Sequence, residues 1–382
     1  MRKANAVIVV LLAVLLLPTA VFSGGRKEAS SSAVYFAWAG PLTGNSKQYG
    51  DTEKVAIEIA LADIKAAGGV LGGKEIIVDF FDDKNDATEA VNIANKIVGD
   101  GKYSAIVGHF SSTPGMATAP IYEEGELVVY SPTVSHADFS SLGNYIFRNA
   151  TTVALDTVAY VDYAYNKLGV RNVAILNVND DWGNNIAKIF TDRFEKLGGR
   201  VIFHDNFIPD QTKDFTPMIA KIKQANPEVF FPICYYAESA QILIQMDSQS
   251  YKPRHTFLSG SSLKQELVDV AGKLADGCLL MSDFSPDIPR AEFARVMKAY
   301  KDKTGKDGDL FVLRTYDVVC QLAAAINKAN SADPKKIRPV LAQMKDYPSL
   351  AGPYSMSEEG DALRPLQPIL VENGKFVNIS GR

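Results

Sequence analysis

A strand, a helix and a second strand follow one another in residues 34–83, VYFAWAGPLTGNSKQYGDTEKVAIEIALADIKAAGGVLGGKEIIVDFFDD. An apolar run over residues 34–39 precedes a helical pattern over 52–67 and a second apolar run over 75–81. Alternation of strand-length apolar runs with amphipathic helices is typical of βαβ units, which build parallel sheets. This segment therefore predicts an α/β fold.

The same alternation continues to about residue 280, in two similar blocks that meet near Asn149. Two such blocks predict two similar lobes, which fits a chain too long for one hydrophobic core. The further strand candidates are residues 104–108, 127–130, 173–178, 201–206, 229–233, 256–258 and 278–281. Helical patterns over 290–304, 311–329 and 334–344 and a β-like tail repeat neither block. We therefore expect the chain to cross between the lobes more than once.

The N-terminus has the pattern of an export signal. Arg2 and Lys3 precede an apolar run over residues 6–17, which ends at Pro18 and is shorter than the ~20 residues of a membrane span. We predict a signal peptide over residues 1–23 and a flexible tether over 24–33, GGRKEASSSA. A lipid anchor would need a cysteine just after the apolar run, but the first cysteine is Cys234.

Charge and cysteine content exclude several kinds of partner. The formal net charge is −4 and both signs are interspersed, which argues against nucleic acid and against a polybasic membrane surface. Cys234, Cys278 and Cys320 form no C-x-x-C pair, and each lies in an apolar stretch. We expect them to be buried small side chains rather than redox or metal sites.

Signatures of catalysis are missing. The chain has no H-E-x-x-H or G-x-S-x-G motif, and its four histidines are scattered. Residues 68–74, GGVLGGK, have the spacing of a phosphate-binding loop, but Glu75 follows where Ser or Thr should hold magnesium. This segment also leaves a helix and enters a strand, the reverse of a phosphate loop, so we expect a glycine-rich turn. The sequence predicts no enzyme, no cofactor and no metal.

Two loops rich in hydroxyl groups follow predicted strands. Residues 109–114 are HFSSTP and residues 131–135 are SPTVS. Ligands of parallel α/β sheets sit beyond the carboxyl ends of the strands, and helix N-termini with nearby hydroxyls bind anions. The two loops therefore predict a site for a carboxylate.

These loops belong to a longer series that runs from GPLTG at 40–44 and VGHFSSTPG at 107–115 to DWG at 181–183, TYD at 315–317 and AGP at 351–353. In order and spacing the series resembles the branched-chain amino acid (Leu/Ile/Val) binding proteins of ABC transporters, over essentially the whole mature chain. The resemblance implies a type I periplasmic-binding fold with two Rossmann-like lobes, parallel-rich sheets and a three-strand hinge. It implies a first lobe of residues 34–153 and 283–352 and a second of 154–282 and 353–382.

The resemblance also implies the residues that hold the ligand. It assigns carboxylate binding to the loops that contain Ser112, Thr113, Thr133 and Ser135. It assigns aromatic walls to Tyr49 from the first lobe, to Trp182 and Tyr235 from the second, and to Phe311.

One position departs from the family pattern. Where amino-acid-binding members commonly have an acid for the ligand's ammonium group, this sequence has Ser261. A buried cation without a counter-charge is costly, so a ligand without an ammonium group, such as an amide, urea or an aromatic acid, stays open beside an amino acid. Glu238 is a candidate substitute for the missing acid.

The predicted function is a periplasmic receptor of an ABC importer. It captures a small carboxylate-bearing ligand, foremost an aliphatic or branched-chain amino acid, between its lobes and docks on a membrane permease. We expect a monomer that binds no nucleic acid. The rival functions are a sensory receptor of the same fold and an exported enzyme, for which no catalytic group is found. A ligand-regulated repressor is disfavoured by the export signal and by the lack of a DNA-binding headpiece.

Overall fold

The computed structural model describes residues 33–209, 211–345 and 349–382. The predicted signal peptide, residues 1–23, and residues 24–32 of the predicted tether lie outside the described part of the chain. Residue 33, which we assigned to the tether, is instead the first residue of strand β1 (Ala33–Gly40), because it pairs with Glu75 of the neighbouring strand. Residues Ala33–Arg382 form one structural unit.

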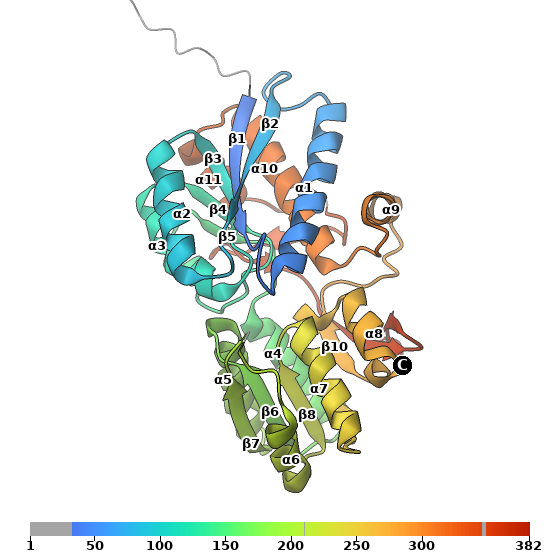
Figure 1. Cartoon of the computed structure of the whole chain (residues 1–382). Helices are drawn as coiled ribbons and strands as arrows, with labels where there is room; N and C mark the ends of the chain where they lie inside the picture. The colour runs from blue at the N-terminus through green and yellow to red at the C-terminus, as the bar shows by residue number, and fades with distance from the viewer. Residues whose placement is uncertain (1–32, 210, 346–348) are drawn as a thin grey trace, which may run out of the picture. The chain divides into compact units, whose positions relative to one another are not determined.

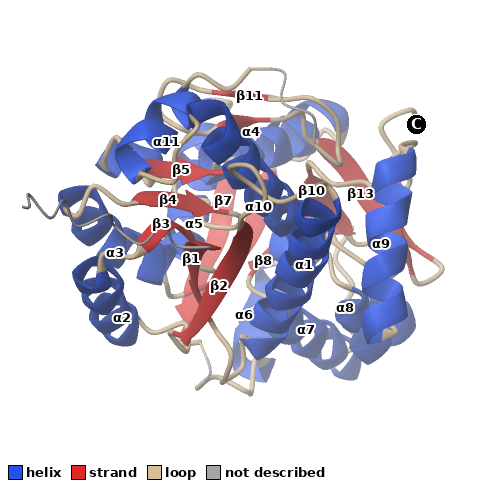
Figure 2. Ribbon diagram, turned by 90° about the horizontal axis from the view of Figure 1, so that it is seen from above, coloured by secondary structure: helices blue, strands red, loops and turns tan. Residues whose placement is uncertain are grey.

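The first lobe is built on a sheet of five parallel strands in the order β2-β1-β3-β4-β5 (Figure 1). After β1 its strands are β2 (Glu75–Asp82), β3 (Tyr103–Gly108), β4 (Val128–Ser131) and β5 (Ile146–Arg148). Helices lie on both faces of this sheet (Figure 2). They are α2 (Ala87–Asp100) and α3 (Ser112–Glu124) on one face, and α1 (Lys47–Ala66), α10 (Leu310–Ala329) and α11 (Pro334–Ala342) on the other.

The second lobe repeats this plan with the parallel order β7-β6-β8-β9. Its strands are β6 (Asn172–Val178), β7 (Arg200–Phe207), β8 (Val229–Ile233) and β9 (His255–Thr256). A bridge between Phe257 and Leu279 joins it to an antiparallel sheet of β10 (Leu279–Ser282), β13 (Gln367–Glu372) and β14 (Lys375–Asn378). The helices pack in pairs: α4 (Val153–Asp162) on α5 (Asp181–Lys196), α6 (Thr216–Ala225) on α7 (Tyr236–Ser248), and α7 on α8 (Gln265–Ala271).

The chain passes between the lobes three times, as the resemblance implied. It leaves β5 for α4, leaves β10 for α9 (Ala291–Thr304) and α10, and leaves the hairpin of β11 (Ser355–Met356) and β12 (Ala362–Leu363) for β13. In each parallel sheet the strand order reverses next to the first strand, at β1/β3 and at β6/β8. Ligands of such sheets bind at the carboxyl ends of these switch points. The residue boundaries of the lobes stay a prediction.

Two local predictions can be compared with the structure. The segment at 68–74 is the expected glycine-rich turn between α1 and β2, with Val70 and Lys74 bridged and positive φ at Gly68, Gly69, Gly72 and Gly73. Helix α1, however, begins at Lys47 rather than at residue 52. The polar residues of its first turn hide the apolar periodicity, so the pattern missed that Tyr49 is helical.

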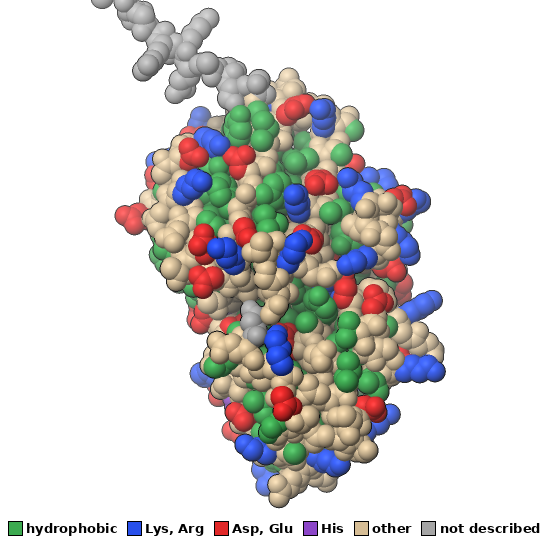
Figure 3. Space-filling view, in the orientation of Figure 1, with side chains coloured by type: hydrophobic (Ala, Val, Ile, Leu, Met, Phe, Trp, Pro, Cys, Tyr) green, Lys and Arg blue, Asp and Glu red, His purple; other side chains and the backbone are tan. Residues whose placement is uncertain are grey.

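The predicted burial of the cysteines is confirmed for Cys234 and Cys278, and Cys320 is half-buried; none of the three forms a disulfide among the described residues. Burial raises the pKa of Cys278 to about 12, which disfavours the reactive thiolate. On the face shown in Figure 3, Lys and Arg side chains are interspersed with Asp and Glu, in agreement with the charge pattern of the sequence. Helix α10 has the length and apolar composition of a membrane span, but 83% of its apolar window is buried, as in a core helix.

Gly50 shows how tightly α1 packs on the loop after β1. A Cβ atom at Gly50 would lie 1.8 Å from the carbonyl oxygen of Pro41. We expect Gly50→Ala to lower the free energy of unfolding by about 1–3 kcal/mol, because the backbone must shift to admit the methyl group. Gly99→Ala in α2 is the matched control, since nothing lies within 4 Å of its added Cβ and alanine favours the helix. Urea denaturation of both variants tests this; equal midpoints would contradict the tight contact.

Candidate functional site

A cavity of about 70 Å³ lies between the carboxyl ends of the two sheets. Both lobes supply its wall, together with two residues of the connecting segments. The first lobe gives Phe110, Ser111, Ser112, Thr133, Ser135, Leu310, Phe311 and Arg314. The second gives Asp156, Thr157, Tyr160, Trp182, Ile186, Phe231, Tyr235, Ser259, Gly260, Ser261 and Met281, and the connections give Ser282 and Leu366. The cavity is therefore enclosed by residues far apart in the sequence.

Hydroxyl groups of two adjacent loops form the first-lobe side of the cavity. Ser112 begins helix α3 after the cap residue Ser111, and its Oγ accepts a hydrogen bond from the backbone N–H of His136 at 3.2 Å. Thr133 Oγ1 donates to the carbonyl of Phe110 at 2.6 Å. These bonds tie the two loops together. The N-terminus of α3, with the positive end of the helix dipole, favours an anion here.

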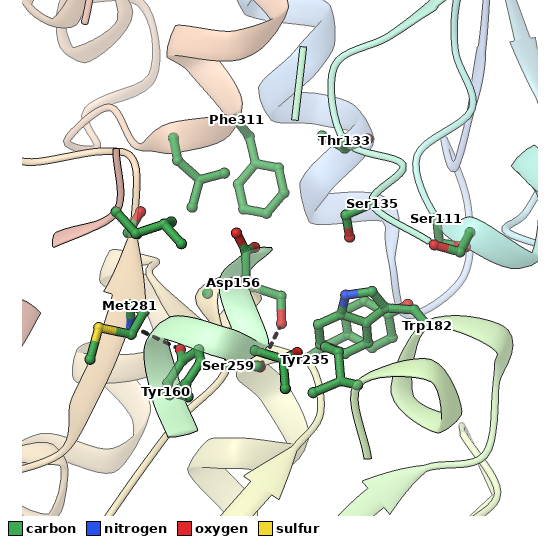
Figure 4. A pocket seen from close by; sticks show the side chains of 18 of the residues that line it. Ser111, Thr133, Ser135, Asp156, Tyr160, Trp182, Tyr235, Ser259, Met281 and Phe311 are labelled. Atoms are coloured by element: carbon green, nitrogen blue, oxygen red, sulfur yellow. Dashed lines mark hydrogen bonds between the residues drawn. The ribbon is translucent and has the colours of Figure 1, made fainter. Parts of the chain in front are cut away.

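Stacked aromatic rings form the opposite wall. Trp182 and Tyr235 stack with their ring centroids 5.1 Å apart, and Tyr235 donates a hydrogen bond to Asp180 Oδ2 at 3.1 Å. Phe311 faces them from the first lobe (Figure 4). Aromatic walls with few polar groups are the common lining of sites for apolar parts of small ligands.

Tyr49 packs against two aromatic rings of the cavity wall. Its ring lies 4.5 Å from that of Phe110 and 4.9 Å from that of Phe311, centroid to centroid. Its hydroxyl donates to the carbonyl of Ser261 at 3.1 Å and accepts from the N–H of Tyr236 at 3.2 Å. Both partners belong to the second lobe, so Tyr49 links the two lobes next to the cavity.

The predicted site residues fall into two groups. The wall of the cavity contains Ser112, Thr133, Ser135, Trp182, Tyr235, Ser261 and Phe311. Tyr49, Thr113 and Glu238 line a second, polar cavity of about 400 Å³, which shares Tyr235 and Ser111 with the first. Thr113 Oγ1 there accepts from the N–H of Asp181 across the lobes at 3.2 Å. The structure therefore does not bring Glu238 to the first cavity, where it would have to replace the missing acid.

Ser261, which we predicted to stand in place of the family's acid, lines the cavity and carries no charge. Its Oγ donates to the carbonyl of Cys234 at 3.0 Å and lies 2.9 Å from the Oγ of Ser259. These contacts make the second-lobe corner of the cavity a cluster of small hydroxyls. A cationic group would find no counter-charge in this corner.

Sequence reasoning missed the acid that does reach the cavity. Asp156 lies in the first turn of α4, whose N-cap Thr152 accepts from the N–H of Leu155 at 3.1 Å. Figure 4 shows its carboxylate directed into the space below Phe311. Burial raises the pKa of Asp156 to about 7, against the opposing effects of the Thr151 hydroxyl and the Arg314 guanidinium. A lone acid in the apolar segment VALDTVAY, just after the first crossing, was the signal available.

Behind Asp156 a buried charge cluster links the segments that connect the lobes. Arg314 NH2 contacts Asp283 Oδ1 at 2.5 Å, and Arg364 contacts Asp283 at 3.4 Å and Asp317 at 3.1 Å. Although burial opposes ionisation, the two guanidiniums hold the pKa of Asp283 below its ordinary value. Because Asp283 follows β10 and Arg364 follows β12, the cluster fixes two of the three connections.

A second buried pair crosses the lobes beside the aromatic group. Lys264, just before α8, is 1% exposed at its side chain and contacts Asp309 Oδ2, at the N-cap of α10, at 2.6 Å. Its Nζ lies 5.1 Å from the ring centroids of both Tyr49 and Phe311. The inter-lobe ion pair therefore lies directly against the aromatic rings of Tyr49 and Phe311.

Comparison with known proteins identifies the family. The family model for periplasmic binding proteins matches residues 33–372. The chain belongs to the periplasmic binding protein family. Among curated relatives, the Leu/Ile/Val-binding protein of Escherichia coli strain K12 is 29% identical over 335 residues, which are 87% of this chain and 89% of that protein. The Leu/Ile/Val/Thr-binding protein of Salmonella typhimurium strain LT2 matches with the same identity and coverage.

Solved structures show the same fold for this periplasmic binding protein. A leucine-binding protein from Thermotoga maritima MSB8 superposes with a TM-score of 0.83 at 24% identity, covering 91% of this chain and 98% of that one. A solute-binding protein from Rhodopseudomonas palustris BisB5, in complex with 3,4-dihydroxybenzoic acid, has a TM-score of 0.84 at 22% identity, covering 91% and 97%. The type I periplasmic-binding fold is thus confirmed. The Rhodopseudomonas palustris protein is a solute-binding protein of an ABC transporter, and as a member of the periplasmic binding protein family this chain is a solute-binding protein, not an enzyme.

Proposed function

We propose that this protein captures an aliphatic or branched-chain amino acid between its lobes and delivers it to the membrane permease of an ABC importer. The main support is the enclosed cavity, which has loop hydroxyls on one side and stacked aromatic rings on the other. The hydroxyls and the N-terminus of α3 suit a carboxylate, and the rings suit an apolar side chain.

The relatives support this ligand class. The Leu/Ile/Val-binding protein of Escherichia coli and the Leu/Ile/Val/Thr-binding protein of Salmonella typhimurium match most of the chain. A substrate-binding protein of a branched-chain amino acid transporter from Streptococcus pneumoniae was solved in complex with isoleucine. The predicted leader fits export to the periplasm, where such a receptor meets its solute, and we infer that it works there as a monomer. Tyr49, Thr113 and Glu238 would then shape the entrance to the cavity rather than its wall.

The hydroxyl loops provide a test of this assignment. We expect Ser112→Ala with Ser135→Ala to weaken leucine binding about 100-fold or more, because two hydrogen bonds to a charged group are lost. Isothermal titration with leucine, isoleucine and valine measures the effect. Ser141→Ala with Ser248→Ala removes two exposed hydroxyls from helical turns and is the matched control. Wild-type affinity in the first variant would contradict the carboxylate site.

Benzoate, urea and simple amides belong in the same titration. Tight binding of one of these, with no response to any amino acid, would replace the proposed ligand class. A thermal-shift screen with the same compounds gives an independent readout, because a ligand that binds only the folded state raises its melting temperature.

A further inference from the structure

Asp156 is a buried acid that forms no ion pair in the described ranges, although the Thr151 hydroxyl and the more distant Arg314 and Arg148 partly offset the effect of burial on its pKa. Its Oδ1 is inaccessible to solvent and has no hydrogen-bond partner there. No ion pair within 4.0 Å in those ranges includes Asp156. A buried carboxylate in this situation either takes up a proton or waits for a cation.

The cations near Asp156 are engaged elsewhere. Arg314, which also reaches the cavity wall, directs its Nε and NH2 to Asp283. Arg364 is shared between Asp283 and Asp317. Arg148, at the end of β5, pairs with Asp361. The guanidiniums of Arg314 and Arg364 thus contact the carboxylates of Asp283 and Asp317, and neither forms an ion pair with Asp156.

We propose that Asp156 accepts a cationic group of the ligand, so that the cavity selects solutes that carry an ammonium group beside their carboxylate. The inference rests on the proposed function and names the ammonium partner that the sequence could not locate at Ser261 or Glu238. It makes Asp156 a specificity-determining residue of this site.

The position of Asp156 relative to the hydroxyl loops fits an α-amino acid. The N–H of Val153, in the first turn of α4, donates to the carbonyl of Ser135 at 2.8 Å. Asp156 follows Val153 by three residues, and positions i and i+3 of a helix lie on the same face. Ser135 and Asp156 therefore both reach the cavity from the region where α4 begins, and Figure 4 shows both side chains in that cavity. Neighbouring acceptor and donor sites match the adjacent carboxylate and ammonium groups of one α-carbon.

Proton competition follows from the same geometry. Burial raises the pKa of Asp156 to about 7 in the empty cavity, with Arg314 and Arg148 opposing the rise and Asp283 adding to it. An ammonium ligand binds the ionised form, so binding displaces a proton when the pH is below this value. Affinity for leucine should fall as the pH is lowered through 7, by about 30-fold between pH 8 and pH 5.5 for one such group.

The test compares Asp156→Asn with wild type by isothermal titration of L-leucine and of 4-methylpentanoate, its analogue without the ammonium group. For wild type we expect leucine to bind far more tightly than the analogue. Asn keeps the shape but removes the charge, and leucine affinity should fall about 30-fold or more at pH 8. The variant should also lose the pH dependence and bind the analogue at least as well as wild type does.

The Asp156→Asn variant is expected to fold, because its amide is neutral in a buried place. Because the folded-state pKa is raised from 3.8 to about 7, stability falls as the pH rises from about 4 to 7, and the full cost is present at pH 8, where the neutral amide avoids it. Empty Asp156→Asn protein should therefore melt no lower than wild type at pH 8. Asp162→Asn is the matched control: it removes one acid from the same helix, where Asp162 pairs with Arg193 at the surface.

The outcomes separate this inference from the proposed function. Wild-type leucine affinity in Asp156→Asn, or equal binding of leucine and 4-methylpentanoate by wild type, overturns the role of Asp156 and leaves solute capture standing. No binding of any amino acid by wild type overturns the proposed ligand class itself. A pH profile that persists in Asp156→Asn assigns the titration to another group and also overturns the inference.

Discussion

Replacing Arg148 with methionine is expected to lower the free energy of unfolding by about 3–5 kcal/mol. The Arg148 side chain is 0% exposed, and its Nε contacts Asp361 Oδ1 at 2.5 Å. Its two terminal nitrogens donate to the carbonyls of His136 and Ala137, at 3.1 Å for Ala137. Methionine fills similar space but leaves these acceptors without donors in a buried place, which is the costly part of the change.

The same variant should weaken ligand binding, because His136 and Ala137 directly follow Ser135. Urea denaturation followed by tryptophan fluorescence gives the stability, and titration with leucine gives the affinity. Arg193→Met is the control, since Arg193 makes a half-exposed pair with Asp162 that contributes about 1 kcal/mol or less. A loss for Arg148→Met no greater than that of the control would show that Arg148 does not hold the loop after β4.

Lys264→Met is expected to weaken leucine binding by about 30-fold or more. The family resemblance implies that the lobes separate when the cleft is empty. Separation would return Lys264 and Asp309 to water, whereas closure buries them in contact with the walls formed by Tyr49 and Phe311. With methionine in place of lysine, closure would bury Asp309 without its partner, so the closed form becomes less populated.

A compensating variant makes this prediction specific. Lys264→Met with Asp309→Asn removes both charges, and asparagine can still cap α10 through the N–H groups of Phe311 and Val312. The pair variant should recover much of the lost affinity. Small-angle scattering with saturating leucine should report a larger radius of gyration for Lys264→Met alone. Lys298→Met, which breaks an exposed pair with Asp302, is the control; if it matches Lys264→Met in affinity, the buried pair has no role in closure.

Some features of the site could be predicted from the sequence with no structure. The loops after β3 and β4 are adjacent because parallel strands end at one edge, so the meeting of Ser112 and Ser135 followed from strand order. Trp182 and Tyr235 follow β6 and β8, which are neighbours for the same reason. Their roles in binding stay predictions, and so do the lobe boundaries.

Other features could not be predicted, because they depend on how separate segments pack. Asp156 follows a lobe crossing rather than a strand, and only the packing of α4 beside Ser135 turns it into the cavity. Glu238, which local sequence favoured as the substitute acid, lies instead in the neighbouring polar cavity because α7 begins at Tyr236 and directs it there.

The sequence by itself determined the α/β class, the order of strands and helices and the hydroxyl loops at their ends. These follow from interactions between near neighbours, whose spacing of two or three to four residues is written in the order of the side chains. Only the tertiary structure decided which charges meet: Lys264 and Asp309 are 45 residues apart and Arg148 and Asp361 are 213 apart. The strength of such pairs comes from burial, which exists only after the lobes have folded around them.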